Sequence, residues 1–170
     1  MSTFYMSGCI PDKDNAMDYF EERYFRVEEL IHADNNFQEA VLAMSTENPD
    51  STPLDSISFD DMLQEVRKCY EELNLKISEL AAENLTVIED DHQLHRSYLS
   101  LLDSYKNEIK TGYKKVLQQI EELDDESNSE PKKLTEDFQK SSTSLDKSIE
   151  LFYESCEQFG EAYGLEIEWE

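Results

Sequence analysis

The feature that most constrains this chain is an apolar residue at every seventh position from Phe59 to Leu101. A period of seven is close to two turns of an α-helix, so these residues line one helical face. A second, mostly apolar set follows four residues after each member of the first. Together they predict one long amphipathic helix over residues 58–124. The predicted partner-binding seam consists of Phe59, Leu63, Val66, Tyr70, Leu73, Ile77, Leu80, Val87, Leu94, Tyr98, Leu101, Tyr105, Ile109, Tyr113, Val116, Ile120 and Leu123.

The register of this seam moves by one residue after Tyr105. The following apolar residues run through Ile109, Tyr113 and Val116, with Gly112 inside the shift. A skip of this kind locally distorts a supercoil. We therefore expect an irregularity in the helix at this point.

Two polar residues, Asn84 and Asp91, fall at seam positions. Polar residues at core positions of a coiled coil set its register and oligomer number, and we assign that role to both. The alternative is a hairpin turn near Glu89-Asp90-Asp91, with Asp91 capping a new helix at His92. Because neither glycine nor proline marks a turn there, we expect a continuous helix.

Residues 1–57 are predicted to form an N-terminal helical head and a linker. Apolar residues at spacings of three and four, among them Met17, Phe20 and Tyr24, predict a helical segment over residues 12–44, which is either one helix with a break near Asn36 or two helices. Asn36 with Glu39 resembles a capping box. Two prolines and many small polar residues predict an exposed linker over residues 45–57.

The C-terminal part of the chain is predicted to consist of a linker, a helix and a short tail. Residues 125–133 are an acidic linker with a proline, which should end the long helix. Heptad spacing predicts an aromatic helix over residues 134–164, with Gly160 or Gly164 at its end. Residues 165–170 form a tail in which apolar and acidic side chains alternate.

The predicted fold class is all-α, an elongated helical or coiled-coil protein with one long central helix and shorter flanking helices. A compact antiparallel helical bundle is the alternative. A continuous helix over residues 58–124 would be about 100 Å long. Its apolar face would be exposed to solvent unless other helices covered it. The C-terminal helix is too short to cover the stripe alone. We therefore expect self-association or binding of other helical proteins.

Charge narrows the range of partners further. The chain holds 40 acidic and 15 basic residues, a net charge of −25 that is spread over its whole length. Phosphate backbones would be repelled, so direct nucleic-acid binding is disfavoured, and a basic protein is the easier partner. No apolar run approaches the roughly 18 residues of a membrane span. Cys9, Cys69 and Cys156 form no C-x-x-C motif, and no secretory signal precedes them, which indicates a cytoplasmic or nuclear protein.

The sequence offers little for catalysis. It has only four glycines, and it contains neither a phosphate-binding glycine motif nor a recognisable nucleophile with its base, so we expect no enzyme activity and no cofactor. Glu89 and His92 have a Glu-x-x-His spacing, and His95 follows. Di-iron bundles need that motif twice with two further glutamates, so we expect no metal, and a helical-bundle metalloenzyme is a remote alternative.

Two surface features remain. The first is a basic patch that could contact an acidic segment or pair with acids of a neighbouring helix, formed by Lys106, Lys110, Lys114 and Lys115. The second is a pair of short phosphorylation patterns at Thr52 and Ser58, and the Ser58 hydroxyl also suits a helix cap.

The function expected from these patterns is a non-enzymatic interaction subunit or scaffold of a multi-protein assembly. Cytoskeletal, kinetochore and vesicle-tethering complexes are built from such subunits, which is an analogy of architecture alone. The alternative is an acidic chaperone or mimic that sequesters a basic protein.

Overall fold

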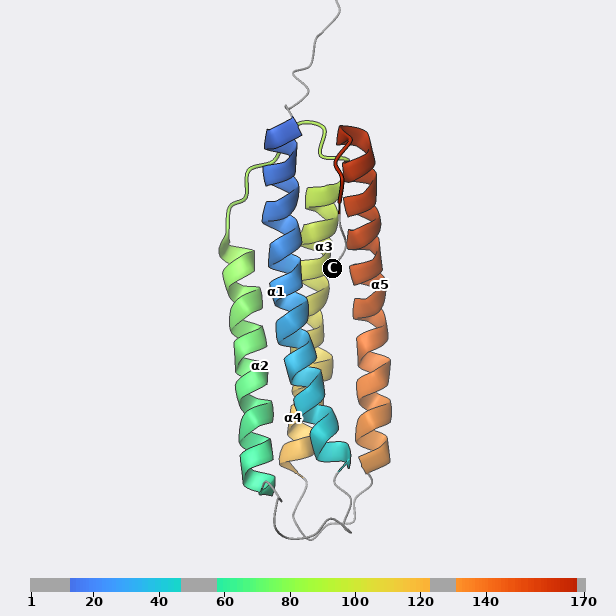
Figure 1. The fold of residues 1–170 in the computed structure, drawn as a ribbon. Coiled ribbons are helices and arrows are strands. Elements are labelled where there is room, and N and C mark those ends of the chain that lie inside the picture. Colours follow the sequence, from blue (N-terminus) through green and yellow to red (C-terminus); the bar gives the residue numbers. More distant parts are fainter. Residues whose placement is uncertain (1–12, 47–57, 123–130, 168–170) are drawn as a thin grey trace, which may run out of the picture.

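The protein is an all-α bundle in a computed structural model that describes residues 13–46, 58–122 and 131–167 (Figure 1). Within them, α3, η1 and α4 follow one another without a gap and form one rod. Four rods therefore pack side by side and alternate in direction, as in an up-down-up-down bundle. The elements are α1 (Lys13–Thr46), α2 (Phe59–Ala82), α3 (Leu94–Glu108), η1 (Ile109–Tyr113), α4 (Lys114–Glu121) and α5 (Pro131–Tyr163).

Each rod contributes apolar side chains to one continuous core. Leu30 of α1, Leu73 of α2, Leu101 of α3 and Phe152 of α5 are all fully buried. Burying a side chain of this kind contributes about 1.5–3 kcal/mol relative to leaving it exposed. The apolar helix faces predicted from the sequence therefore pack against one another within a single chain.

The expected continuous helix over residues 58–124 is wrong, and the compact antiparallel bundle is the observed fold. α2 ends at Ala82, residues 83–88 form no helix or strand, and a turn leads into α3 at Leu94. The heptad spacing continues through this connection only by coincidence, since Val87 is 54% exposed and Asn84 is also exposed.

The turn forms without glycine or proline because side chains stabilise it. His92 and Gln93 adopt positive φ angles of 47° and 70°. The Asp91 carboxylate accepts hydrogen bonds from the backbone N–H groups of Gln93 and His95, both at 3.1 Å. The Tyr163 hydroxyl donates to the Asp90 carbonyl at 2.8 Å. Asp91 therefore caps the start of a new helix, as the hairpin alternative proposed, although that helix begins at Leu94.

The expected break in the first helix is also wrong, because α1 is continuous through Asn36. The Asn36 amide and the His32 ring form a side-chain hydrogen bond along the helix surface at 3.1 Å. Two residues earlier, Asp34 points into the core, where residues of other rods satisfy its carboxylate. Tertiary contacts thus keep a polar stretch helical although its local propensity is weak.

The register shift after Tyr105 is confirmed. It appears as the π-helix η1, which adds one residue to the turn and so keeps the following apolar residues facing inward. The side chains on both sides of it that stay buried are Tyr105, Ile109, Tyr113, Val116 and Ile120.

The last helix starts earlier than expected, at Pro131, because proline is well tolerated in the first turn. Its end at Gly164 is confirmed. Gly164 has a φ of 60°, its N–H donates to the Glu161 carbonyl, and the Leu165 N–H donates to the Gly160 carbonyl at 2.9 Å. These two bonds form a Schellman motif that directs residues 165–167, the described part of the tail, back toward the bundle (Figure 1).

Candidate functional site

The predicted seam lies mainly inside the bundle of this chain. Its buried members are Val66, Leu73, Ile77, Leu80, Leu94, Tyr98, Leu101, Tyr105, Ile109, Tyr113, Val116 and Ile120. Phe59, Leu63 and Tyr70 are partly exposed, and Leu123 lies outside the described residues. Since helices of the same chain cover the stripe, it no longer requires a second chain.

The other predicted residues lie on the surface or outside the described part. Lys106 forms an ion pair with Asp103 on its own helix at 3.4 Å, and Lys110, Lys114 and Lys115 are exposed along η1 and α4. Ser58 is the N-cap of α2 and accepts a hydrogen bond from the Asp61 N–H, which confirms its capping role. Thr52 lies outside the described residues. Asn84 and Asp91 both lie in the connection between α2 and α3 rather than at bundle core positions.

A buried arginine ties this connection to α1. Arg23 is fully buried and lies over the Tyr19 ring, 3.5 Å from the ring centroid. Its guanidinium donates to the Thr86 carbonyl and approaches His95 Nδ1 at 3.2 Å. Burial lowers the pKa of Arg23, while burial and the nearby guanidinium lower the pKa of His95. Tyr19 completes the network by donating to Asp91 at 3.3 Å, so the cluster positions the start of α3.

A second buried polar cluster surrounds Asp34. Its carboxylate accepts hydrogen bonds from Tyr113 at 2.7 Å, Tyr105 at 3.1 Å and Gln38 at 3.0 Å. Burial raises the pKa of Asp34, although the three hydrogen bonds oppose that rise. Burial, together with the Asp34 charge, also raises the pKa values of Tyr105 and Tyr113. The cluster joins α1 to the diagonal rod formed by α3 and η1, and we interpret it as structural.

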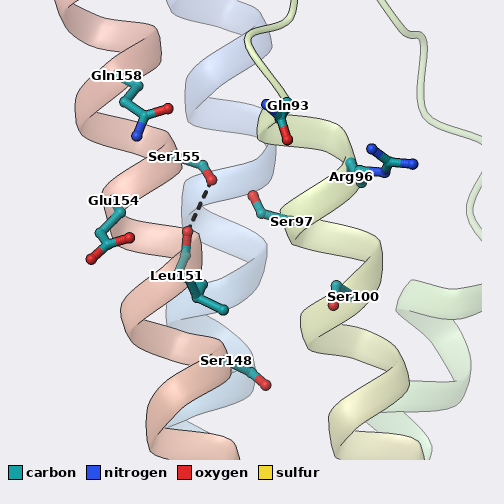
Figure 2. Close-up of a pocket in the computed structure, with 9 residues that line it drawn as sticks. All are labelled: Gln93, Arg96, Ser97, Ser100, Ser148, Leu151, Glu154, Ser155 and Gln158. Atoms are coloured by element: carbon teal, nitrogen blue, oxygen red, sulfur yellow. Dashed lines mark hydrogen bonds between the residues drawn. The ribbon is translucent and has the colours of Figure 1, made fainter.

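A groove of about 330 Å³ runs between α3 and α5 (Figure 2). Ser97 of α3 and Ser155 of α5 point into it, while Arg96 and Glu154 point away on either side. Ser155 donates to the Leu151 carbonyl and Ser97 donates to a carbonyl of its own helix, both at 2.9 Å. Each of these two hydroxyls therefore donates its hydrogen bond within its own helix. The groove exists because the serine side chains that line it are small.

A more apolar groove of about 370 Å³ lies between α1 and the tail. We call it the α1–tail groove. Phe25 is 57% exposed at this groove and forms an edge contact with Tyr24, with the ring centroids 5.8 Å apart. The residues that line it are Met17, Phe20, Glu21, Tyr24, Phe25, Glu28, Glu166 and Ile167.

Neighbouring residues hold the walls of this groove in place. Tyr24 stacks on Phe20 with the ring centroids 5.4 Å apart, and Tyr153 of α5 donates a hydrogen bond to Glu28. Ile167 packs directly over Gly160, where a Cβ atom would lie 2.5 Å from Ile167 Cδ1. Gly160 is a candidate helix terminator by sequence, but in the structure it instead makes room for the tail.

The arrangement gives no support to metal chemistry at the Glu-x-x-His spacing. Glu89 and His92 lie in the turn before α3, so the spacing does not place both side chains on one helical face. Across residues 13–46, 58–122 and 131–167, no cluster of three or more His, Cys, Asp or Glu side chains could hold a metal ion. No helix in the same ranges is long and apolar enough to cross a membrane.

The sequence pattern groups Met17, Phe20 and Tyr24 on one helical face, and it did not lead us to Phe25. A signal for Phe25 was present, because this large aromatic residue lies beside that face, with Glu21 four residues before it and Glu28 three residues after it. On a helix these three side chains share one surface. The contribution of the tail could not be predicted, since it depends on how α5 ends.

Comparisons with known proteins leave the family open. The chain matches no protein-family model, and neither the curated proteins nor the solved structures contain a match.

Proposed function

We propose that this protein is a non-enzymatic helical bundle that binds another protein, as a subunit or scaffold of a multi-protein assembly, and that the partner occupies the α1–tail groove. The observation that carries this proposal is Phe25, an aromatic side chain left 57% exposed beside an apolar groove. Aromatic residues in such positions act as anchors at the centre of protein interfaces. The heptad seam no longer supports the proposal, because the bundle buries it.

The two described cysteines agree with a reducing compartment. Cys69 and Cys156 are buried free thiols. Burial raises the pKa of Cys156 to about 12, so its thiol stays protonated and packs as a small apolar side chain. These thiols support the proposal of a cytoplasmic or nuclear location.

The test compares two serine substitutions in the full-length chain. Phe25→Ser removes the aromatic group at the groove, and Leu75→Ser removes an apolar group of similar exposure, 59%, on α2. Each tagged variant and the unchanged chain would be used to retain partners from cell extract, with quantification by mass spectrometry.

We expect a partner that the unchanged chain and Leu75→Ser retain equally and that Phe25→Ser loses by about tenfold or more, because truncating an interface anchor costs more than about 1 kcal/mol. Equal retention by both variants would contradict the assignment of the groove. A chain that retains no protein above the tag alone would contradict the proposed function itself.

A further inference from the structure

The charged residues among those that line the α1–tail groove all have the same sign. Glu21, Glu28 and Glu166 are the charged residues among its described lining residues, and the others are apolar or aromatic. The whole chain carries a net charge of −25, so an approaching acidic segment would be repelled before it reached the groove. A positively charged segment would be attracted over the same distance.

The spacing of these groups defines what could fit. Glu21 and Glu28 are two helical turns apart on α1, a separation of about 10 Å along the axis, and Phe25 lies between them. Three residues of an extended chain span about the same length. An extended segment could therefore place one cation near each carboxylate and an apolar side chain against Phe25.

The side chains that line the groove are also held in position before any ligand binds. Tyr153 orients the Glu28 carboxylate, and the stacked rings of Phe20 and Tyr24 fix the apolar floor. Groups that are already in place lose less conformational freedom when a ligand binds. The exposed Phe25 ring can add a cation–π contact with lysine or arginine.

We propose that the α1–tail groove binds a short basic segment of a partner protein, in which lysine or arginine residues flank an apolar or aromatic anchor. This inference rests on the proposed function, since it specifies the partner for the same groove. The competing occupant is the last part of the tail, Glu168, Trp169 and Glu170. Their two carboxylates would meet carboxylates of the groove, so charge favours the basic partner.

The experiment titrates the full-length chain with defined peptides and measures the Kd by fluorescence anisotropy. The probe is a short end-capped peptide in which lysines flank a central phenylalanine. One control peptide has serine in place of the phenylalanine, and another has glutamate in place of the lysines. We expect the probe to bind more tightly than both controls, and Phe25→Ser but not Leu75→Ser to weaken it by about fivefold or more.

A matched pair of triple variants separates the groove from the overall charge. Glu21→Gln, Glu28→Gln and Glu166→Gln together remove the groove carboxylates, and they should weaken the probe by about tenfold. The same number of glutamates removed from the exposed face of α2 should change the Kd by less than about twofold, because salt screens distant surface charges. The control variant combines Glu71→Gln, Glu72→Gln and Glu79→Gln.

Three results would overturn the inference. The serine peptide could bind as tightly as the probe, or both triple variants could weaken the probe equally, and either result would mean attraction by bulk charge alone. Third, Trp169→Ala could tighten binding about tenfold or more, which would identify the chain's own C-terminus as the occupant.

The failures of the two proposals differ. A Phe25-dependent partner combined with a probe that does not bind would reject only the basic segment. A probe that binds in the groove, in a chain that retains no protein partner, would reject the proposed function and leave the groove as a basic-peptide site.

Discussion

The packing of Ile167, in the tail, against Gly160 can be tested by a double-mutant cycle. In Gly160→Ala the new Cβ would lie 2.5 Å from Ile167 Cδ1 and 3.3 Å from Ile167 Cγ1. Carbon atoms pack best at about 3.5–4.0 Å, so Ile167 must move by about 1 Å or leave its site. The perturbation therefore acts on the tail through one identified contact.

Two opposing effects set the magnitude. Alanine is about 0.5–1 kcal/mol more favourable than glycine inside a helix, and Gly160 lies inside α5. Displacing the partly buried Ile167 should cost about 1–2 kcal/mol of apolar burial. Gly160→Ala should therefore be neutral to slightly destabilising in the unchanged chain, whereas with Ile167→Ala it should stabilise by about 0.5–1 kcal/mol. The expected coupling is about 1–2 kcal/mol.

The assay is urea unfolding of the unchanged chain, the two single variants and the double variant. The free energies of unfolding should then differ from additivity by the coupling given above. Additive effects, to within about 0.5 kcal/mol, would refute the seating of the tail on Gly160. Gly164→Ala is a useful comparison, because its Cβ meets open space and any loss comes from its φ of 60°, at about 1 kcal/mol.

Three further predictions follow from the bundle. Asp34→Asn should flatten the pH dependence of stability. The pKa of Asp34 in the folded chain lies above the unfolded value near 3.8, so the unfolded chain loses this proton first. The free energy of unfolding of the unchanged chain therefore falls as pH rises between the two pKa values. Urea unfolding from pH 4 upward measures this, and parallel curves for the two proteins would contradict it. Asp91→Ala should cost about 1–2 kcal/mol through lost capping, whereas Asp90→Ala should cost less than about 0.5 kcal/mol because Tyr163 bonds only its carbonyl. Sedimentation velocity should show a particle about 50 Å long, the length of α1, and a frictional ratio suited to a rod of about 100 Å would contradict the bundle.

Much of the fold could be predicted because local sequence patterns report directly on helices. The spacing of apolar residues indicated the helical character of each described rod, although it merged α2 and α3 into one helix. The one-residue shift in register near Ile109 indicated the irregular turn that the π-helix forms. Ser58 was assigned correctly as a helix cap, and Gly164 was one of the two glycines proposed for the end of the last helix, since caps depend on a few neighbouring residues.

The candidate site was predicted only in part. The spacing of Met17, Phe20 and Tyr24 places them on one apolar face of α1, and all three line the groove, although Phe20 is also buried as part of the core. Which part stays open depends on where the tail lies, and no local pattern in α1 encodes the position of Ile167. The groove thus arises from the way two distant segments meet.

The sequence by itself determined that this protein is helical, acidic and amphipathic along its length, because those properties depend on residue type and spacing alone. Only the tertiary structure decided that the two halves of the heptad pattern form separate rods that pack in the core of the same chain. The reason is physical. Asp91 caps α3 locally, but Arg23 and Tyr163 donate hydrogen bonds to the carbonyls of Thr86 and Asp90, and these two contacts come from segments more than 60 residues away. A periodic pattern fixes which face of a helix is buried, but it does not specify which chain buries it.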